Sequence, residues 1–217
     1  MSIGQLLVIA KAPVPGRVKT RLCPPCTFPQ AARVAAAALA DTIDAVSAVP
    51  AVERTLVLSG RYPAPAGWRV VPQRGTGLAE RLANGFADTA RAGLPSLLVG
   101  MDTPQVSPGL LTAALATVGY GGVDAVLGPA TDGGWWALGL RDPAHAAALR
   151  DVLMSTAHTR ADTLAALRGG GLRIVGLPEL RDVDTAVDAW AVAHLCAATS
   201  RFRRAVRAHV PQAAVTP

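Results

Sequence analysis

The sequence predicts an α/β protein in which helices cover both faces of a mostly parallel sheet. Three observations predict this class. Short runs of aliphatic and β-branched residues alternate with helical segments throughout the 217 residues. These runs are continuously apolar, which is typical of strands buried on both faces. Hydrophobic residues make up 51% of the chain and charged residues 17%, so the chain can bury a large core.

The predicted elements follow one another in a regular order. The predicted strands are 6–10, 54–59, 68–71, 95–100, 123–128, 135–140 and 172–176, and the predicted helices are 29–48, 77–92, 107–119, segments around 145–169 and a last helix from about 185. Thr27 and Pro29 are typical of a helix start. No linker-like segment divides the chain, so residues 1–217 are expected to form one domain, with 198–217 a basic C-terminal helix or tail.

Composition narrows the classes of function. The formal net charge is +6, but aromatic residues are only 4% and do not interleave with the basic ones, so nucleic acid is not the expected partner. The most apolar helix, 29–48, is interrupted by Arg33, Asp41 and Asp44, so we expect an amphipathic helix and no membrane span. No signal-peptide pattern follows Met1, and a cytoplasmic protein is the default expectation. The sequence does not indicate the oligomeric state.

Two of the three cysteines, Cys23 and Cys26, enclose two prolines. A redox pair usually has its first cysteine at a helix N-terminus, and zinc sites need further ligands at a regular spacing. Neither pattern is present, because the prolines predict a rigid turn and the four histidines are scattered. We therefore expect these cysteines to pack beside the neighbouring loop.

A cationic loop follows the first predicted strand. Lys11, Arg17, Lys19 and Arg21 lie within eleven positions, and no carboxylate occurs before Asp41. Pro and Gly make this segment a loop, and the cations predict an anionic ligand. In open α/β sheets ligands bind at the carboxyl ends of the strands, so the residues that follow the other strands are the candidates for completing a site.

Those residues include glycines and several acids. Gly75 and Gly77 can let the backbone approach a ligand closely. Four candidate acids follow later strands, namely Asp102, Asp132, Asp182 and Asp184, with Asp188 nearby. Carboxylates beside a polycationic loop suit a divalent metal that bridges to phosphate. Alternatively, Asp102 and Asp184 cap the helices that follow them, and Gly133 and Gly134 only form a hairpin turn.

Several motifs together resemble one family. They are K-A-P-x-P-G-x-x-K-T-R-L, Q-x-G-x-G-L-x-E-R-L, G-M-D-T-P, G-P-A-T-D-G-G-W-W-A-L-G-L and D-V-D-T. The series, which spans roughly residues 5–190, resembles the DUF2064 family of GT-A-fold, nucleotide-diphospho-sugar transferase-like proteins, and its opening loop is similar to that of 2-phospholactate guanylyltransferase. The resemblance implies a three-layer, Rossmann-like GT-A sandwich and a nucleotide-dependent transferase.

The resemblance also implies roles for individual residues. Phosphates would be held by Lys11, Arg17, Lys19 and Arg21, and the base would be read by the segment that contains Gln73, Gly75, Gly77 and Leu78. Asp102 and Asp184 would bind Mg²⁺ or Mn²⁺. The acceptor would lie against Asp132, Gly133, Gly134, Trp135 and Trp136. The catalytic group would be Lys11, Lys19, Arg21, Asp102 and Asp132.

Two reactions fit these expectations. In nucleotidyl transfer, a phosphorylated or hydroxylated small molecule attacks a nucleoside triphosphate and expels pyrophosphate; four loop cations favour this highly charged substrate. In glycosyl transfer, a sugar nucleotide is the donor and Asp132 serves as base. A nucleotide-binding module without catalysis is the third alternative.

The chain departs from the family pattern at Met154, where a Trp is expected before Ser155 and Thr156, and in its Cys23–Cys26 pair.

Overall fold

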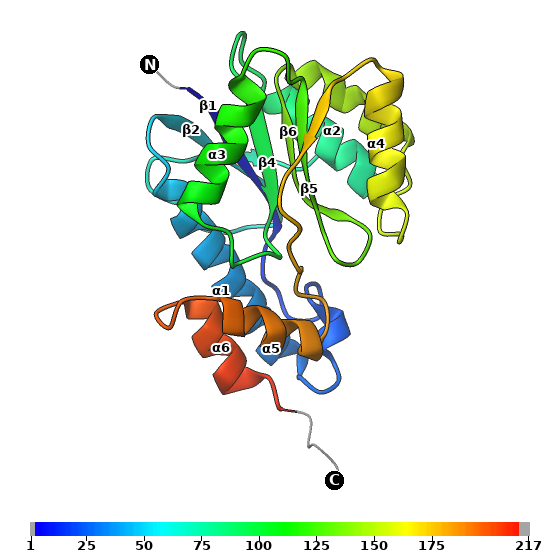
Figure 1. The fold of residues 1–217 in the computed structure, drawn as a ribbon. Helices are drawn as coiled ribbons and strands as arrows, with labels where there is room; N and C mark the ends of the chain where they lie inside the picture. Colours follow the sequence, from blue (N-terminus) through cyan, green and yellow to red (C-terminus); the bar gives the residue numbers. More distant parts are fainter. Residues whose placement is uncertain (1–2, 213–217) are drawn as a thin grey trace.

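A single seven-stranded sheet forms the centre of the computed structural model, which describes residues 3–212 (Figure 1). Its strands are β1 (Gly4–Lys11), β2 (Val52–Ser59), β3 (Arg69–Pro72), β4 (Ser96–Gly100), β5 (Ala125–Pro129), β6 (Trp135–Leu140) and β7 (Ile174–Gly176). The strand order is β3-β2-β1-β4-β6-β5-β7. Only β6 runs antiparallel to its neighbours, so the predicted mostly parallel sheet is confirmed.

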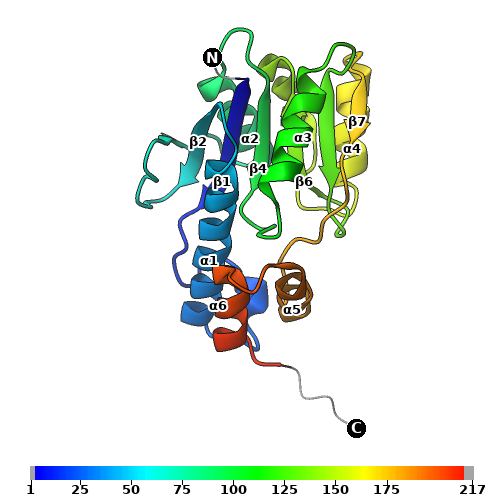
Figure 2. The same ribbon diagram turned by 60° about the vertical axis from the view of Figure 1, so that its left-hand side comes forward.

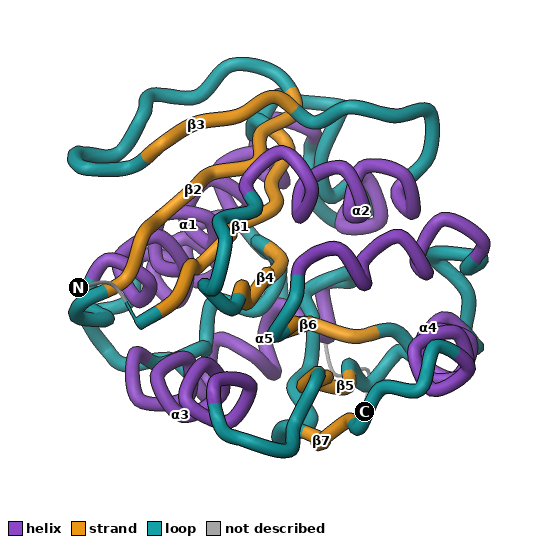
Figure 3. The backbone as a smooth tube through the Cα atoms, turned by 90° about the horizontal axis from the view of Figure 1, so that it is seen from above, coloured by secondary structure: helices purple, strands orange, loops and turns teal. Residues whose placement is uncertain are grey.

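Helices cover both faces of this sheet. The helices are α1 (Phe28–Ser47), α2 (Leu78–Thr89), α3 (Pro108–Gly119), α4 (Thr159–Gly169), α5 (Ala186–Leu195) and α6 (Arg201–His209), with 3-10 turns η1 (Thr20–Leu22) and η2 (Pro143–Asp151), and the first four of them form the layers on the sheet. Seen from above, α1 and α3 lie on one side of the strands and α2 and α4 on the other (Figure 3). The three-layer architecture predicted from the sequence is therefore confirmed.

The central strands are apolar throughout because each face packs against a helical layer. Along β1, Leu6 and Val8 belong to the core under α1 and α3, whereas Leu7 between them belongs to the core under α2 and α4. All three side chains are completely buried. Alternation of this kind places the side chains of a strand on opposite faces, and here both faces are dry.

The residues that start α3 and α5 show whether Asp102 and Asp184, which follow strands, serve as helix caps. The hydroxyl of Ser107 caps α3, and Thr185 caps α5 in a capping box with Asp188. Neither Asp102 nor Asp184 caps a helix, so the capping alternative for these two acids is wrong. Thr27 caps α1 as predicted.

A third apolar cluster lies beyond the end of the sheet. Here α6 packs against the first half of α1, and α5 packs against α6 (Figure 2). The expected last helix is two helices, because Ser200 starts a new helix after the break at Cys196. Asp41 of α1 fixes this start: its carboxylate accepts hydrogen bonds from Ser200 Oγ (2.6 Å) and from the backbone N–H of Phe202 (2.9 Å). Residues 213–217 of the predicted tail lie outside the described residues.

No helix in the described part of the chain is both long enough and apolar enough to cross a membrane.

Candidate active site

A cleft of about 760 Å³ opens at the carboxyl ends of β1 and β4. Its walls come from the loop after β1, from residues 73–82 and 100–103, from the turn between β5 and β6, and from the segments 154–159 and 182–184. These are the strand ends at which the sequence predicted a site, and the position agrees with the general location of ligands in open α/β sheets.

All four predicted cations line the cleft, but two of them already have partners. Lys19 Nζ lies 2.8 Å from Asp102 Oδ1 and 3.2 Å from Asp184 Oδ1. Arg21 Nη1 lies 2.9 Å from the other oxygen of Asp184. The family resemblance implied that both side chains hold phosphate, and these ion pairs were not predicted. Lys11 and Arg17 have no ion-pair partner among the described residues.

The ammonium of Lys19 is held in a fixed position. Its side chain is only 8% exposed. Burial by itself lowers the pKa of Lys19, but the charges of Asp102 and Asp184 outweigh this effect and the pKa ends above its usual value. Its backbone adopts a left-handed conformation (φ 49°) at the start of η1, which is uncommon outside glycine. Lys19 therefore stays charged and joins the two predicted metal ligands to each other.

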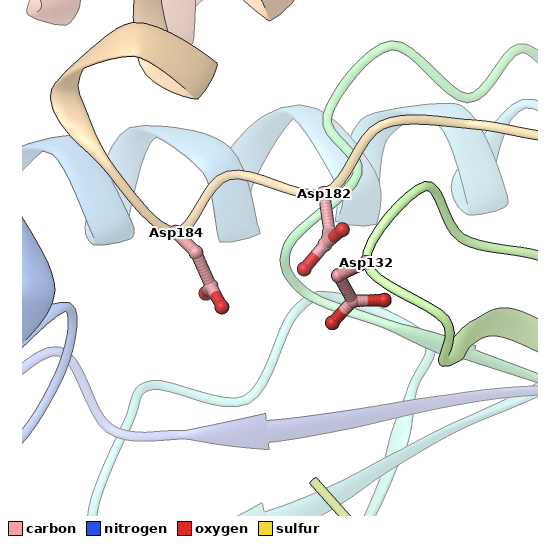
Figure 4. A group of neighbouring side chains, drawn as sticks. All are labelled: Asp132, Asp182 and Asp184. Carbon is pink, nitrogen blue, oxygen red and sulfur yellow. The ribbon is translucent and has the colours of Figure 1, made fainter. Parts of the chain in front are cut away.

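Three carboxylates meet beside this ion pair. Asp132, Asp182 and Asp184 each offer an oxygen, and these oxygens lie within 4.8 Å of one another (Figure 4). Burial, reinforced by the charges of Asp132 and Asp184, raises the pKa of Asp182 to about 6. Closely spaced carboxylates of this kind are hard oxygen donors and suit a divalent cation. Asp184 is shared between this cluster and the predicted pair with Asp102.

The segment after β3 forms one wall of the cleft and is fixed by its own helix. The Gln73 Nε2 group donates to the backbone oxygens of Ala10 (2.8 Å) and Val57 (3.1 Å), so its amide orientation is set and its Oε1 is left without a described partner. Glu80 accepts the N–H of Thr76 (2.8 Å) across the bend at Gly75, where φ is 120°. Gln73 and Leu78 line the cleft together with Thr76, whereas Gly75 and Gly77 shape the turn between them.

Arg81 lines the same wall and was missed in the sequence analysis. Its Nε donates to the backbone oxygen of Gly75 (3.1 Å), which places the side chain beside the loop. The helical period gave a signal for it, because Arg81 lies three residues after Leu78 and hence on the same face of α2.

The opposite wall is built from the hairpin between β5 and β6. Gly133 lies in this turn with φ 90°, and a Cβ added to it would meet the backbone oxygen of Ala157 at 2.2 Å, so only glycine fits. The turn therefore packs directly on the segment 154–157. Asp132 Oδ1 accepts the N–H of Gly134 (2.7 Å), which orients the carboxylate. The hairpin interpretation of the two glycines is confirmed, and this turn also carries Asp132 into the cleft.

The two tryptophans of this wall differ in exposure. Trp135 is half-buried, and its indole N–H donates to Thr163 Oγ1 (3.1 Å). Trp136 is 2% exposed and donates to the backbone oxygen of Pro178 (3.0 Å). Both line the cleft, but Trp136 is mainly a core residue.

The cysteines of the Cys-Pro-Pro-Cys segment pack in the third apolar cluster with Leu22, beside the cationic loop. All three cysteines are free thiols, and burial raises the pKa of each. A high pKa disfavours the reactive thiolate, so this geometry supports the packing interpretation.

Comparison with known proteins agrees with this architecture. The family described as "Uncharacterized protein conserved in bacteria (DUF2064)" matches residues 31–156. A candidate nucleotide-diphospho-sugar transferase from Desulfovibrio desulfuricans G20 has a similar structure, with a TM-score of 0.83 at 23% identity over 96% of this chain and 95% of that one. No curated protein sequence matches the chain.

More distant structures share the fold. Rv0371c from Mycobacterium tuberculosis H37Rv, solved in complex with manganese, gives a TM-score of 0.53 at 19% identity, covering 95% of this chain and all of that one. CMP:2-keto-3-deoxy-manno-octonic acid synthetase complexed with CTP gives 0.55 at 11% identity, covering 88% and 97%. At such low identities these likenesses establish the nucleotidyltransferase and GT-A type of fold.

Proposed function

The chain belongs to the DUF2064 family, and from that premise we propose that it is a metal-dependent nucleotidyltransferase that joins a nucleotide to a small-molecule acceptor. One observation carries the proposal. A single cleft brings together five cationic side chains and four carboxylates, namely Lys11, Arg17, Lys19, Arg21, Arg81, Asp102, Asp132, Asp182 and Asp184. Cations suit a polyphosphate, and the carboxylates suit the divalent cation that accompanies it.

The phosphates would bind in the half of the cleft that carries the cations. Lys11 and Arg17 are free to pair with phosphate oxygens, and Arg21 is largely exposed at its position beside Asp184. Gln73 presents a fixed carbonyl oxygen at the neighbouring wall, where the base would lie. Fixed groups of this kind position the donor and stabilise the charge that develops as pyrophosphate leaves.

A divalent cation would be held by Asp182 and Asp184. Two observations support this assignment. The carboxylates cluster in this chain, and the structurally similar Rv0371c was solved in complex with manganese. When bound, the cation would neutralise phosphate charge in the transition state. Asp102, which the family resemblance implies as a second ligand, pairs with Lys19 and does not belong to the cluster of three carboxylates, and its role stays a prediction.

Asp132 would act on the acceptor. It is exposed, it belongs to the hairpin wall, and the N–H of Gly134 fixes its orientation. An acceptor hydroxyl that attacks the α-phosphorus forms the new P–O bond while the bond to pyrophosphate breaks. The hydroxyl proton then passes to the Asp132 carboxylate.

Glycosyl transfer is the second candidate. It is favoured by the likeness to the Desulfovibrio protein, whose TM-score of 0.83 exceeds the 0.55 of the CMP synthetase. In that reaction the same cations and metal would hold the diphosphate of a sugar nucleotide as leaving group, and Asp132 would again take the acceptor proton.

A thermal-shift panel tests the proposal. The four nucleoside triphosphates are compared with UDP- and GDP-sugars, each with Mg²⁺ and with EDTA. A ligand at about a hundred times its Kd adds about 2.7 kcal/mol to the free energy of unfolding. Stabilisation by one triphosphate that EDTA removes, followed by pyrophosphate release, supports nucleotidyl transfer. Stabilisation by a sugar nucleotide alone supports glycosyl transfer, and no stabilisation contradicts both.

Variants separate catalysis from binding. Asp184→Asn should abolish the metal-dependent stabilisation and turnover, whereas Asp151→Asn, an exposed aspartate at the end of η2, is the matched control. If Asp184→Asn and Asp102→Asn both keep tight nucleotide binding and biological function, the protein is a binding module and the proposed transfer reaction is wrong.

A further inference from the structure

The two halves of the cleft differ in charge, and we infer from this difference that the second substrate is an uncharged or cationic hydroxyl compound and not a phosphate ester. The inference rests on the proposed function and narrows it. It names the chemical class that enters the half formed by residues 130–136 and 154–159, opposite the cationic loop.

The charge partition is complete among the described residues that line the cleft. Every cation comes from the segment 11–21 or from Arg81, and the opposite half contributes Asp132 but no Lys, Arg or His. His158 and Arg160 belong to the same stretch of chain, yet neither lines the cleft, and Arg160 pairs with Glu179 (3.5 Å). A phosphate ester bound here would face the carboxylate of Asp132, and no cationic side chain of this half would pair with it.

The groups that do line this half suit a neutral polar molecule. Ser155 and Thr156 bring hydroxyls, and Trp135 brings apolar ring surface, since its own N–H is occupied by Thr163. Ser155 is exposed and holds a left-handed backbone conformation (φ 63°), which is uncommon for a residue other than glycine. An aromatic ring, hydroxyls and a carboxylate together can receive hydroxyl groups or an organic ammonium.

The position of Asp132 points to the same class. A phosphate acceptor is already an anionic nucleophile at neutral pH and requires no base. A hydroxyl must lose its proton as it attacks, and a fixed carboxylate on the acceptor side provides the group that takes it. The Asp132 carboxylate can therefore accept the proton of a hydroxyl substrate, whereas it would repel a phosphorylated substrate.

Matched pairs of probes test the inference. Isothermal titration compares ribose with ribose 5-phosphate, glycerol with glycerol 3-phosphate, and ethanolamine with phosphoethanolamine. The protein is first saturated with Mg²⁺ and pyrophosphate, so that the phosphate half is filled and cannot capture the esters. We expect at least one parent compound to bind tenfold or more tightly than its ester. An ester that binds more tightly than its parent, or the failure of every parent to bind, would overturn the inference.

Two lysine substitutions test whether the charge of the acceptor half sets the preference between a parent compound and its phosphate ester. Ser155→Lys places a cation in the acceptor half and should shift the preference toward the phosphate esters by tenfold or more. Ala116→Lys adds the same charge on the exposed face of α3 and should leave the preference unchanged. Failure of this inference differs from failure of the proposed function: a protein that binds a nucleotide yet prefers the esters loses only the inference, whereas absence of nucleotide and pyrophosphate binding removes the function itself.

Discussion

Replacing Lys19 by methionine removes the ammonium that separates Asp102 from Asp184. Methionine keeps much of the apolar stem, so the change is mainly the loss of one buried charge. Breaking a fully buried pair costs about 3–5 kcal/mol. Here the lysine is 8% exposed but its partners are 42% and 31% exposed, so water screens part of the loss and we expect a cost of about 1–3 kcal/mol.

The same change should strengthen metal binding in the absence of nucleotide. Two charges about 4 Å apart interact by roughly 1–4 kcal/mol between bulk water and the protein surface, and 1.4 kcal/mol is a tenfold change in affinity. Without the ammonium, the carboxylates beside it attract a divalent cation more strongly. We therefore expect Lys19→Met to bind Mn²⁺ at least tenfold more tightly than the wild type, and Mn²⁺ to restore much of the lost stability.

Urea unfolding followed by tryptophan fluorescence, with and without Mn²⁺, measures both effects. Lys11→Met is the matched control, because Lys11 is exposed and has no ion-pair partner among the described residues. If Lys19→Met is as stable as the wild type without metal and gains nothing from Mn²⁺, the ammonium does not compensate the two carboxylates and the reasoning fails.

Three further predictions concern the surroundings of the cleft. Folding raises the pKa of Asp182 from 3.8 to about 6, so its contribution to stability is present below pH 4 and is lost as the pH rises through 6. Because Asp182 is half-buried, water screens part of this effect; in metal-free buffer at pH 7 we expect Asp182→Asn to raise the free energy of unfolding by roughly 1–2 kcal/mol, and an unchanged pH profile would contradict this. Gly133→Ala should lower the free energy of unfolding in urea by on the order of 2–4 kcal/mol, because the new Cβ clashes with backbone in addition to the cost of positive φ. Gly67→Ala, at φ 75° with open space around it, measures the cost of positive φ alone, and equal losses in the two variants would show that the clash contributes nothing. Cys26 and Cys196 should react slowly with a thiol reagent at pH 8 and fully after unfolding; a fast native thiol would revive the redox interpretation.

Much of the fold was predictable because its signals are local. Apolar runs of strand length alternate with helical segments, and the start of a helix such as α1 is predicted by Thr27 and the proline that follows. The rule that ligands gather at the carboxyl ends of strands predicts that Asp102, Asp132 and Asp184 lie close together, and all three line the cleft.

The pairing of charges within the cleft was not predictable in the same way. Which carboxylate meets which cation depends on how two distant loops fold over each other, and Lys19 and Asp184 are separated by 165 positions. Asp182, to which the family resemblance gave no metal role, lies in the acidic cluster because the connection after β7 passes beside the hairpin that carries Asp132. Asp188 is different. The pattern Thr185-x-x-Asp188 is a local capping signal, and Asp188 was considered only together with the candidate acids of the cleft.

The hydrogen bonds between Asp41 and the start of α6 have a consequence for the synthesis of the protein. The contact joins the first helix to the last across about 160 positions, and Asp182 and Asp184 lie on the connection that leads to these final helices. On the ribosome, the cationic loop emerges long before Asp182 and Asp184 do. The ligands that we propose could therefore bind a complete cleft only after residues 182–184 have been translated, so the first strands must form without their help.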